Sequence, residues 1–125
     1  MKIDTRVDES KKLTTHTLSG RISLDHIRGI VEAFYKKGPT DNVLWDFRKA
    51  DAEGKVTINE LEQLASFVRK GQEVSGRGKT AIVASSDLIF GLARTYESLA
   101  EIEGVKNPVR VFRSMERAVK WLEKK

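Results

Sequence analysis

The sequence contains no cysteine, which excludes disulfide bonds and thiolate chemistry and favours a cytoplasmic location. It also has no apolar run near the roughly 20 residues that a membrane-spanning helix requires. Its first residues, MKIDTRVDES, carry charges where a signal peptide would have an apolar stretch. We therefore expect a cytoplasmic protein without a membrane span.

Residues suited to catalysis or metal binding are scarce. The two histidines, His16 and His26, do not have the paired spacing of metal ligands, and no cysteine is present to join them. No serine lies in the G-x-S-x-G context of a hydrolase nucleophile. We can name no nucleophile and base that must lie together. We therefore expect a protein that is not an enzyme and that uses no metal and no cofactor.

Basic residues are in modest excess, 23 Lys and Arg against 18 Asp and Glu, which permits binding to polyanions without requiring it. Arg69, Lys70, Arg77 and Lys79 cluster around a glycine-rich stretch, but no aromatic residues accompany them for base stacking. The GRGKT segment in this stretch lacks the first glycine of a phosphate-binding loop, and its lysine precedes a strand. We expect no nucleic-acid partner and no nucleotide site.

The apolar pattern predicts one domain over residues 1–125. Alternation predicts strands at 2–8, 43–47 and 109–113. A segment rich in threonine and apolar residues at 13–22 predicts a second strand that forms a hairpin with the first, and an unbroken apolar run predicts a buried strand at 81–84. Three- and four-residue spacing predicts helices that begin after Ser23, Thr57, Ser85–Asp87 and Ser114. The order ββαβαβαβα predicts an α/β fold with an N-terminal antiparallel hairpin, a mostly parallel sheet and helices mainly on one face.

The segment Lys49–Glu60, KADAEGKVTINE, has the frame of a calcium-binding loop, with acidic residues at positions three, five and twelve and Gly54 at position six. Its first position is a lysine, however, and an ammonium group cannot replace the first carboxylate ligand. A polar turn at 48–55, followed by a helix-capping box of Thr57 and Glu60, accounts for the same residues. We favour the turn over a calcium site.

Polar residues follow the buried strand at 81–84, where the next helix begins. Ligands of parallel α/β sheets tend to bind at this edge, and the free amides of a helix start favour anions. Ser85, Ser86 and Asp87 are therefore candidate ligand- or anion-binding residues, although simple helix capping is the interpretation we favour. Arg94, two turns into the helix, can pair with Asp46 or Asp87 or reach the same ligand.

Two motifs carry a resemblance to a known family. They are Phe90-Gly91-Leu92-Ala93-Arg94 in the predicted third helix and the C-terminal element from Val111-Phe112-Arg113 through Ala118 to Trp121-Leu122. With these motifs and this element order, the chain resembles the SpoIIAA-like, STAS-type proteins, in particular their small stand-alone bacterial members. The resemblance implies a SpoIIAA-like fold, no catalysis, and a role in regulation or ligand sensing.

In the anti-sigma-factor antagonists of that family, a phosphorylatable serine begins the helix after the third strand, within an Asp-Ser-Ser-Gly pattern. The corresponding segment here is Val56–Asn59, in which the aspartate is absent and Thr57 is the only hydroxyl. The resemblance therefore makes Thr57 a candidate phosphoacceptor, although the same residue is expected to cap its helix.

We accordingly expect a non-enzymatic regulatory or protein-interaction domain that resembles anti-sigma-factor antagonists. A half-open sheet face and the helix that carries Phe90 suggest a surface for a protein partner or for a second copy in a homodimer. Its candidate contacts are Phe90, Leu44 and Phe112. The alternative is a small-molecule or lipid carrier, or a sensor, with a pocket between the sheet and the helices.

Overall fold

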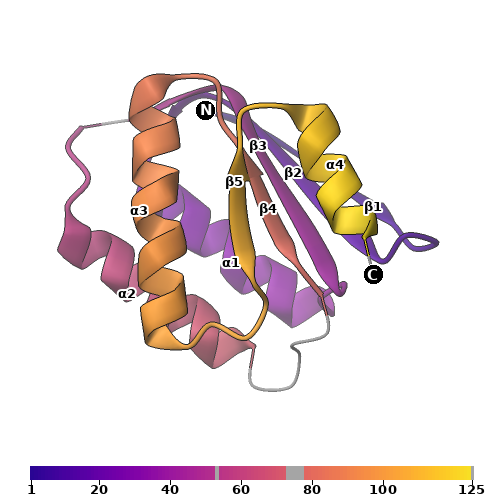
Figure 1. Ribbon diagram of the computed structural model, residues 1–125. Coiled ribbons are helices and arrows are strands. Elements are labelled where there is room, and N and C mark those ends of the chain that lie inside the picture. The colour runs from indigo at the N-terminus through magenta and orange to yellow at the C-terminus, as the bar shows by residue number, and fades with distance from the viewer. Residues whose placement is uncertain (53, 73–77, 125) are drawn as a thin grey trace.

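The computed structural model describes residues 1–52, 54–72 and 78–124. The elements follow the predicted order along the chain, as Figure 1 shows. They are β1 (Lys2–Asp8), β2 (Leu13–Ile22), α1 (Leu24–Lys37), β3 (Asn42–Ala52), α2 (Ile58–Gly71), β4 (Thr80–Val83), α3 (Asp87–Glu103), β5 (Val109–Phe112) and α4 (Met115–Glu123).

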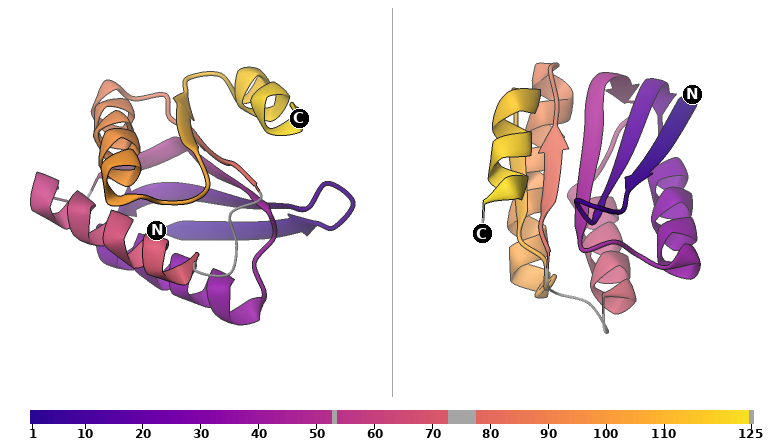
Figure 2. Two further views of the ribbon diagram at one scale, coloured as in Figure 1. Left: turned by 60° about the horizontal axis from the view of Figure 1, so that its bottom comes forward. Right: turned by 90° about the vertical axis from the view of Figure 1, so that its right-hand side faces the viewer.

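The strands form one five-stranded sheet in the order β1-β2-β3-β4-β5. The hairpin of β1 and β2 is antiparallel, whereas β2, β3, β4 and β5 pair in parallel. Helices α1, α2 and α3 cover one face of the sheet, and α4 lies on the other (Figures 1 and 2). The predicted fold class, with helices mainly on one face, is therefore confirmed.

The main core lies between the sheet and α1, α2 and α3. Trp45 and Phe47 of β3 point into it, as their alternation predicts, whereas Leu44 points to the opposite face. The neighbouring strand β4 is buried on both faces, with Ile82 in the main core and Val83 in the second core. Burial on both faces is the reason why the sequence of β4 is an unbroken apolar run.

Helix α4 closes the smaller second core. Its residues Ala118 and Leu122 pack with Leu44 of β3. Lys79, just before β4, donates a hydrogen bond from Nζ to the carbonyl of Trp121 at 2.8 Å. This places a positive charge at the end of α4, where carbonyl groups lack helical partners. The lysine of the GRGKT segment thus helps to hold α4 on the sheet.

Strand β3 is longer than predicted. The sequence pattern predicted a strand at 43–47 and a polar loop from 48, but β3 continues to Ala52. Its second half pairs with β2 from Ser19 to Ile22, after a shift in the register. Arg48 and Lys49 can lie in this half because their side chains are exposed. The first four positions of the calcium-loop frame therefore belong to a strand.

Each helix begins at its predicted capping residue. The side chains of Ser23, Thr57, Ser86 and Ser114 each accept a hydrogen bond from the backbone amide three residues later. Helix α3 ends at Gly104, whose φ of 81° lies in the left-handed region that favours glycine. The limits of the helices thus follow from local sequence, because the caps satisfy amides that a helix leaves free.

Candidate functional site

A cavity of about 130 Å³ lies between the sheet and helices α1, α2 and α3. The sheet and all three of these helices contribute residues to its wall. Most of the lining side chains are apolar, among them Ile22, Ile27, Val31, Phe34, Val43, Trp45, Phe47, Leu61, Leu64, Val68, Ile82, Ile89, Leu92 and Ala93. A space of this kind is where the sequence-based alternative placed a pocket for a small molecule.

Polar side chains join the wall near the C-terminal end of α2. Gln72, which is 3% exposed, accepts hydrogen bonds through Oε1 from the backbone amides of Lys106 at 2.9 Å and Asn107 at 3.3 Å. Gln72 and Asn107 both line the cavity. The end of α2 is thereby tied to the loop before β5, and the polar part of the wall is held in place from two sides.

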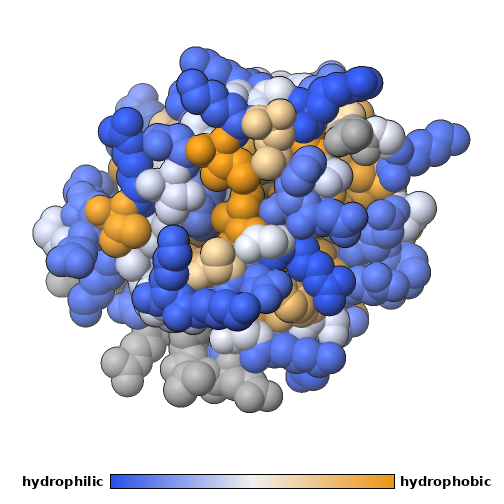
Figure 3. Space-filling view, turned by 180° about the vertical axis from the view of Figure 1, so that it is seen from behind, coloured by the Kyte–Doolittle hydropathy of each residue, from blue (hydrophilic) through white to orange (hydrophobic). Residues whose placement is uncertain are grey.

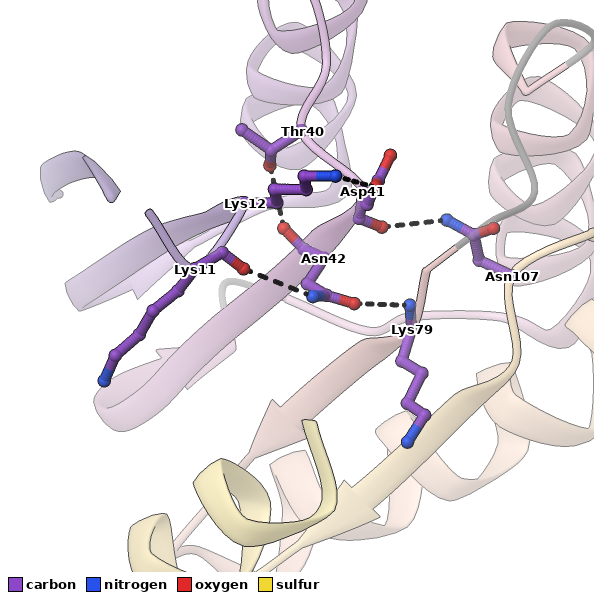
Figure 4. A network of polar contacts seen from close by, with 7 residues as sticks. All are labelled: Lys11, Lys12, Thr40, Asp41, Asn42, Lys79 and Asn107. Atoms are coloured by element: carbon purple, nitrogen blue, oxygen red, sulfur yellow. Dashed lines mark hydrogen bonds and ion pairs between the residues drawn. The ribbon is translucent and has the colours of Figure 1, made fainter. Parts of the chain in front are cut away.

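Asn107 carries a buried oxygen without a partner. Its side chain is 5% exposed, and its Nδ2 donates to the carbonyl of Asp41 at 3.4 Å. Figure 4 shows that the amide oxygen points away from Asp41. Among the residues that the structure describes, this Oδ1 has no hydrogen-bond partner, and a flip of the amide would set it against the Asp41 carbonyl instead. A buried acceptor of this kind is costly unless a donor reaches it.

The Asp41 carbonyl lies within a network at the start of β3. The Asn42 side chain accepts a hydrogen bond from the Lys79 amide at 3.0 Å and extends toward the Lys11 carbonyl (Figure 4). The Thr40 hydroxyl donates to the Asn42 carbonyl at 2.8 Å. These contacts fix the backbone against which the Asn107 amide is oriented.

Two tyrosines also line the cavity. Burial raises the pKa of the Tyr35 phenol, and a hydrogen bond with the Gln72 side chain partly opposes this rise. Burial likewise raises the pKa of the Tyr96 phenol, and the charge that Tyr35 would acquire raises it further. Both phenols therefore stay neutral near pH 7, and the described wall of the cavity presents dipoles rather than charges to a ligand.

This arrangement can hold a small neutral molecule. An apolar cavity of about 150 Å³ is large enough for benzene, whereas pockets for drug-sized ligands begin near 300 Å³. The cavity of about 130 Å³ therefore suits a single small ring or a short branched chain. Asn107 is one of the few polar residues in this wall.

Thr57 lies at the exposed start of α2. Its Oγ1 accepts a hydrogen bond from the Glu60 amide at 3.1 Å and donates to Glu60 Oε1 at 3.0 Å. Glu60 Oε1 in turn accepts from the Thr57 amide at 3.0 Å. The adjacent Ile58 is 61% exposed. Thr57 is thus accessible at the predicted position, while its hydroxyl already serves as the helix cap.

The structure brings Ser85 and Asp87 together with Arg113, which the sequence identified as part of a family motif but not as a candidate site residue. Arg113 donates to the Ser85 carbonyl at 3.1 Å and to Asp87 Oδ1 at 2.8 Å. Its guanidinium group also lies 4.2 Å from the centre of the Phe90 ring. Arg113 is thereby paired with a carboxylate of the chain itself, and β5 is joined to the start of α3.

Arg94 is separate from this group. It pairs with Glu97 at 3.5 Å rather than with Asp46 or Asp87. Asp46 instead pairs with Arg48 at 2.9 Å. Ser86 acts as the N-cap by accepting from the Ile89 amide at 3.2 Å. The favoured capping interpretation thus has direct contacts, whereas an anion-binding role of Ser85, Ser86, Asp87 and Arg94 stays a prediction.

The three candidate surface residues have different environments. Leu44 is 3% exposed beneath α4 and is therefore not available to a partner. Phe112 is half-buried, with its ring centre 5.7 Å from that of Trp121. Phe90 is half-buried under Arg113. Sequence alternation placed Leu44 on the second face of the sheet but could not show that α4 covers it.

Some predicted features lie partly outside the described residues, including Glu53 of the calcium-loop frame and Arg77 of the basic cluster. Within residues 1–52, 54–72 and 78–124, no group of three or more histidine or acidic side chains is placed to hold a metal ion. No helix in that part of the chain is long and apolar enough to cross a membrane.

Comparison of the structure with solved structures identifies the fold. The anti-sigma factor antagonist SpoIIAA in its unphosphorylated form matches with a TM-score of 0.58 and 11% identity, over 99% of this chain and 100% of that chain. The Bacillus cell fate determinant SpoIIAA in the phosphorylated form matches with a TM-score of 0.55 and 12% identity, over 98% and 100%.

An uncharacterised protein of the DUF3478 family from Shewanella loihica PV-4, with a SpoIIAA-like fold, matches with a TM-score of 0.59 and 13% identity, over 97% of this chain and 92% of that chain. No protein-family model and no curated protein matches the sequence. The chain therefore has a SpoIIAA-like fold, as the sequence motifs predicted.

Proposed function

We propose that this chain uses its SpoIIAA-like fold as a non-catalytic sensor, which binds a small, mostly apolar molecule carrying one hydrogen-bond donor. The observation that supports this function is the cavity between the sheet and α1, α2 and α3, which is lined by apolar side chains and by Asn107, whose buried Oδ1 lacks a partner among the described residues. The apolar wall supplies affinity, and Asn107 supplies orientation.

Binding at this place has a structural consequence. Residues from α1, α2 and α3 contact the same space, among them Phe34, Leu64 and Leu92. A ligand that fills the space therefore stabilises the packing of these three helices on the sheet. A ligand that binds only the folded state raises the stability of the protein as its concentration increases. Ligand binding in the cavity would therefore make the exposed surfaces of α1, α2 and α3 more ordered. This is how a sensor of this kind would signal to a partner.

The test compares ring compounds of similar size. Phenol and toluene differ mainly in one hydroxyl, so both fit the apolar space but only phenol can donate to Asn107. We expect both to raise the melting temperature, with phenol binding about tenfold more tightly, or about 1.4 kcal/mol, as expected for one buried hydrogen bond. The advantage of phenol should disappear in Asn107→Leu. A protein that neither compound stabilises would contradict the proposal.

A second function is suggested by the exposed start of α2, where Thr57 is the candidate phosphoacceptor. A phosphate on Thr57 would place new negative charge beside the carboxylate of Glu60, to which the hydroxyl now donates at 3.0 Å. The capping box would have to open, although the free amides of the helix start could receive the phosphate. In this second role, phosphorylation of Thr57 would change the surface around Ile58 and regulate a protein contact.

The direct measurement for this second role is a phosphopeptide map of the protein isolated from its native cells. Phosphate on Thr57, absent from Thr57→Ala, would support a switch. Glu60→Gln is the informative companion, because it keeps the side-chain length but removes the repelling charge. We expect Glu60→Gln to increase the modified fraction, and complete absence of modification in both proteins would reject the switch.

A further inference from the structure

Strand β1 has an open backbone edge. It lies at the end of the sheet and, among the described strands, pairs only with β2. Every residue from Lys2 to Asp8 is exposed. Exposed edges of this length offer unpaired amides and carbonyls to another strand, and proteins usually cover or protect them. The edge of β1 can therefore extend the sheet if a strand of matching chemistry is available.

The side chains of β1 divide into a charged face and an apolar face. The register with β2 places Ile3, Thr5 and Val7 on the face that carries His16 and Leu18, which is the face of the main core. The alternate residues of β1 form the second face, with charges that alternate in sign: Lys2, Asp4, Arg6 and Asp8.

The apolar side chains of this strand remain in contact with solvent. Ile3 is 38% exposed and Val7 is 58% exposed. The back of the molecule is mostly hydrophilic, with small apolar groups between the charged side chains (Figure 3). An edge with two exposed β-branched residues gains from a partner that brings apolar side chains opposite them.

We propose that two copies of this chain pair through β1 in an antiparallel arrangement, with Thr5 on the two-fold axis. Residues whose numbers sum to ten then lie opposite each other. Lys2 faces Asp8, Asp4 faces Arg6, and Ile3 faces Val7, and each pair occurs twice. Opposite charges and β-branched pairs stabilise neighbouring strands in this position. The edge of β1 is thus complementary to itself, which a two-fold interface requires.

Neighbouring registers lack this complementarity. A shift that places Asp4 on the axis sets Asp4 against Asp4 and Lys2 against Arg6. The opposite shift sets Arg6 against Arg6 and Asp4 against Asp8. Like charges directly opposite each other destabilise a strand pair.

An axis that falls between two residues, such as Asp4 and Thr5, is excluded. It would set these two residues opposite each other, although their side chains lie on different faces of the sheet, and a two-fold axis perpendicular to the sheet pairs residues of the same face. Registers with Ile3 or Val7 on the axis also oppose unlike charges, but each keeps only Lys2 against Asp4 or Arg6 against Asp8. The Thr5 register pairs all four charges, so the charge pattern favours this register and a second copy as the occupant.

Two of the charges that favour this register, Asp4 and Arg6, can change partners, whereas Asp8 Oδ1 already accepts hydrogen bonds from Ser10 Oγ at 2.7 Å and from the Lys11 amide at 3.2 Å. Arg6 and Asp4 lie 3.0 Å apart on the same strand, with side chains 83% and 56% exposed. Exposed pairs of this kind contribute little within one molecule. In the proposed dimer, Arg6 of one copy can pair with Asp4 of the other copy across the interface. Because all these charges lie near solvent, we expect association to weaken as salt is added.

Cross-linking tests the register directly, since the chain has no cysteine of its own. Opposite residues of an antiparallel pair have Cβ atoms about 4.5–5.5 Å apart, close to the range that a disulfide spans. Ile3→Cys mixed with Val7→Cys should form a disulfide-linked dimer at least tenfold faster than either variant alone. Two copies of residue 3 would lie about 13 Å apart, four strand positions from each other. Equal rates in the mixture and in the separate variants would overturn the register.

A second experiment reverses the charges of β1 and measures the association constant by sedimentation equilibrium at low salt. Asp4→Arg sets two arginines opposite each other at both positions, so association should fall at least tenfold. Asp4→Arg combined with Arg6→Asp restores opposite charges and should restore association. Both positions are exposed, so the variants should keep the stability of the wild type. A monomeric wild type, or a double variant as weak as the single one, would overturn the proposal. Neither result would bear on ligand binding in the cavity.

Discussion

His16 Nδ1 and Thr5 Oγ1 lie 3.0 Å apart, and this hydrogen bond joins the edge strand β1 to the interior. His16 is 2% exposed, and its ring centre lies 4.5 Å from that of Trp45. Its Nε2 has no hydrogen-bond partner within the described part of the chain. Burial lowers the pKa of His16 to about 4, because the charged imidazole would lose its hydration among aromatic rings.

This pKa predicts how stability changes with pH. The unfolded chain binds a proton at His16 near pH 6.5, whereas the folded protein does so near pH 4. The contribution of neutral His16 is therefore fully present above pH 6.5 and is lost as the pH falls toward 4. The total loss should be roughly 3 kcal/mol in the free energy of unfolding.

Urea denaturation at several pH values between 7 and 4 measures this loss. His16→Phe removes the titrating group but keeps a ring in the core, so its stability should change much less over this range. His26 is exposed, and its Nδ1 accepts from the Ser23 amide in the capping box of α1, a contact that glutamine can also make. His26→Gln is therefore the matched control and should behave as the wild type. If His16→Phe loses as much stability as the wild type, buried His16 is not the cause.

The cavity predicts opposite effects of the same substitution in the two cores. Ala93 lines the cavity, whereas Ala118 is fully buried in the second core and does not. Ala93→Leu should fill empty space and stabilise the protein by about 0.5–2 kcal/mol. Ala118→Leu should cost about 1–3 kcal/mol because the second core has no room for it. Chemical denaturation of both variants checks this, and equal destabilisation would argue that the space at Ala93 is closed.

Two glycines should respond to alanine in opposite ways. Gly29 lies in α1, and a Cβ there would meet no atom within 4 Å, so Gly29→Ala should stabilise the helix by about 0.5–1 kcal/mol. A Cβ on Gly78 would lie 1.6 Å from the Asp41 carbonyl oxygen. Gly78→Ala must therefore displace backbone and should cost about 2 kcal/mol or more. Thermal unfolding of the two variants measures both effects.

The capping role of Thr57 can be separated from any switch. Thr57→Ala should lower the free energy of unfolding by about 1 kcal/mol, because the Glu60 amide loses its acceptor. Thr57→Ser keeps the hydroxyl and should change little. Urea denaturation of the unmodified proteins distinguishes them. An alanine variant as stable as the wild type would show that the capping box contributes little.

Local sequence was sufficient to predict most of the fold. Capping residues such as Thr57 marked the helix starts, and the apolar run of β4 marked a strand covered on both faces. The end of β3 could not be predicted, because Arg48 and Lys49 resemble a polar loop until β2 is placed beside them. The burial of Leu44 depends on where α4 docks, which is a long-range contact that local sequence does not encode.

The site was predictable only in outline. A pocket between sheet and helices follows from the amphipathic pattern, but the orphan oxygen of Asn107 depends on the position of the Asp41 carbonyl, 66 residues away. Asn107 precedes Pro108, so the sequence predicted only a loop at this position. Arg113 lay within a recognised motif, yet its pairing with Asp87 joins two elements whose proximity only the fold reveals.

The most direct test of the account is an NMR titration of the wild-type protein and Ala93→Leu with phenol. A ligand site in the main core predicts saturable shifts in the wild type, centred on the side-chain amide of Asn107 and on methyl groups that line the cavity, such as those of Val43 and Leu64. The same titration should leave Ala93→Leu almost unchanged. Shifts confined to surface residues, or equal shifts in both proteins, would contradict a ligand site inside the main core.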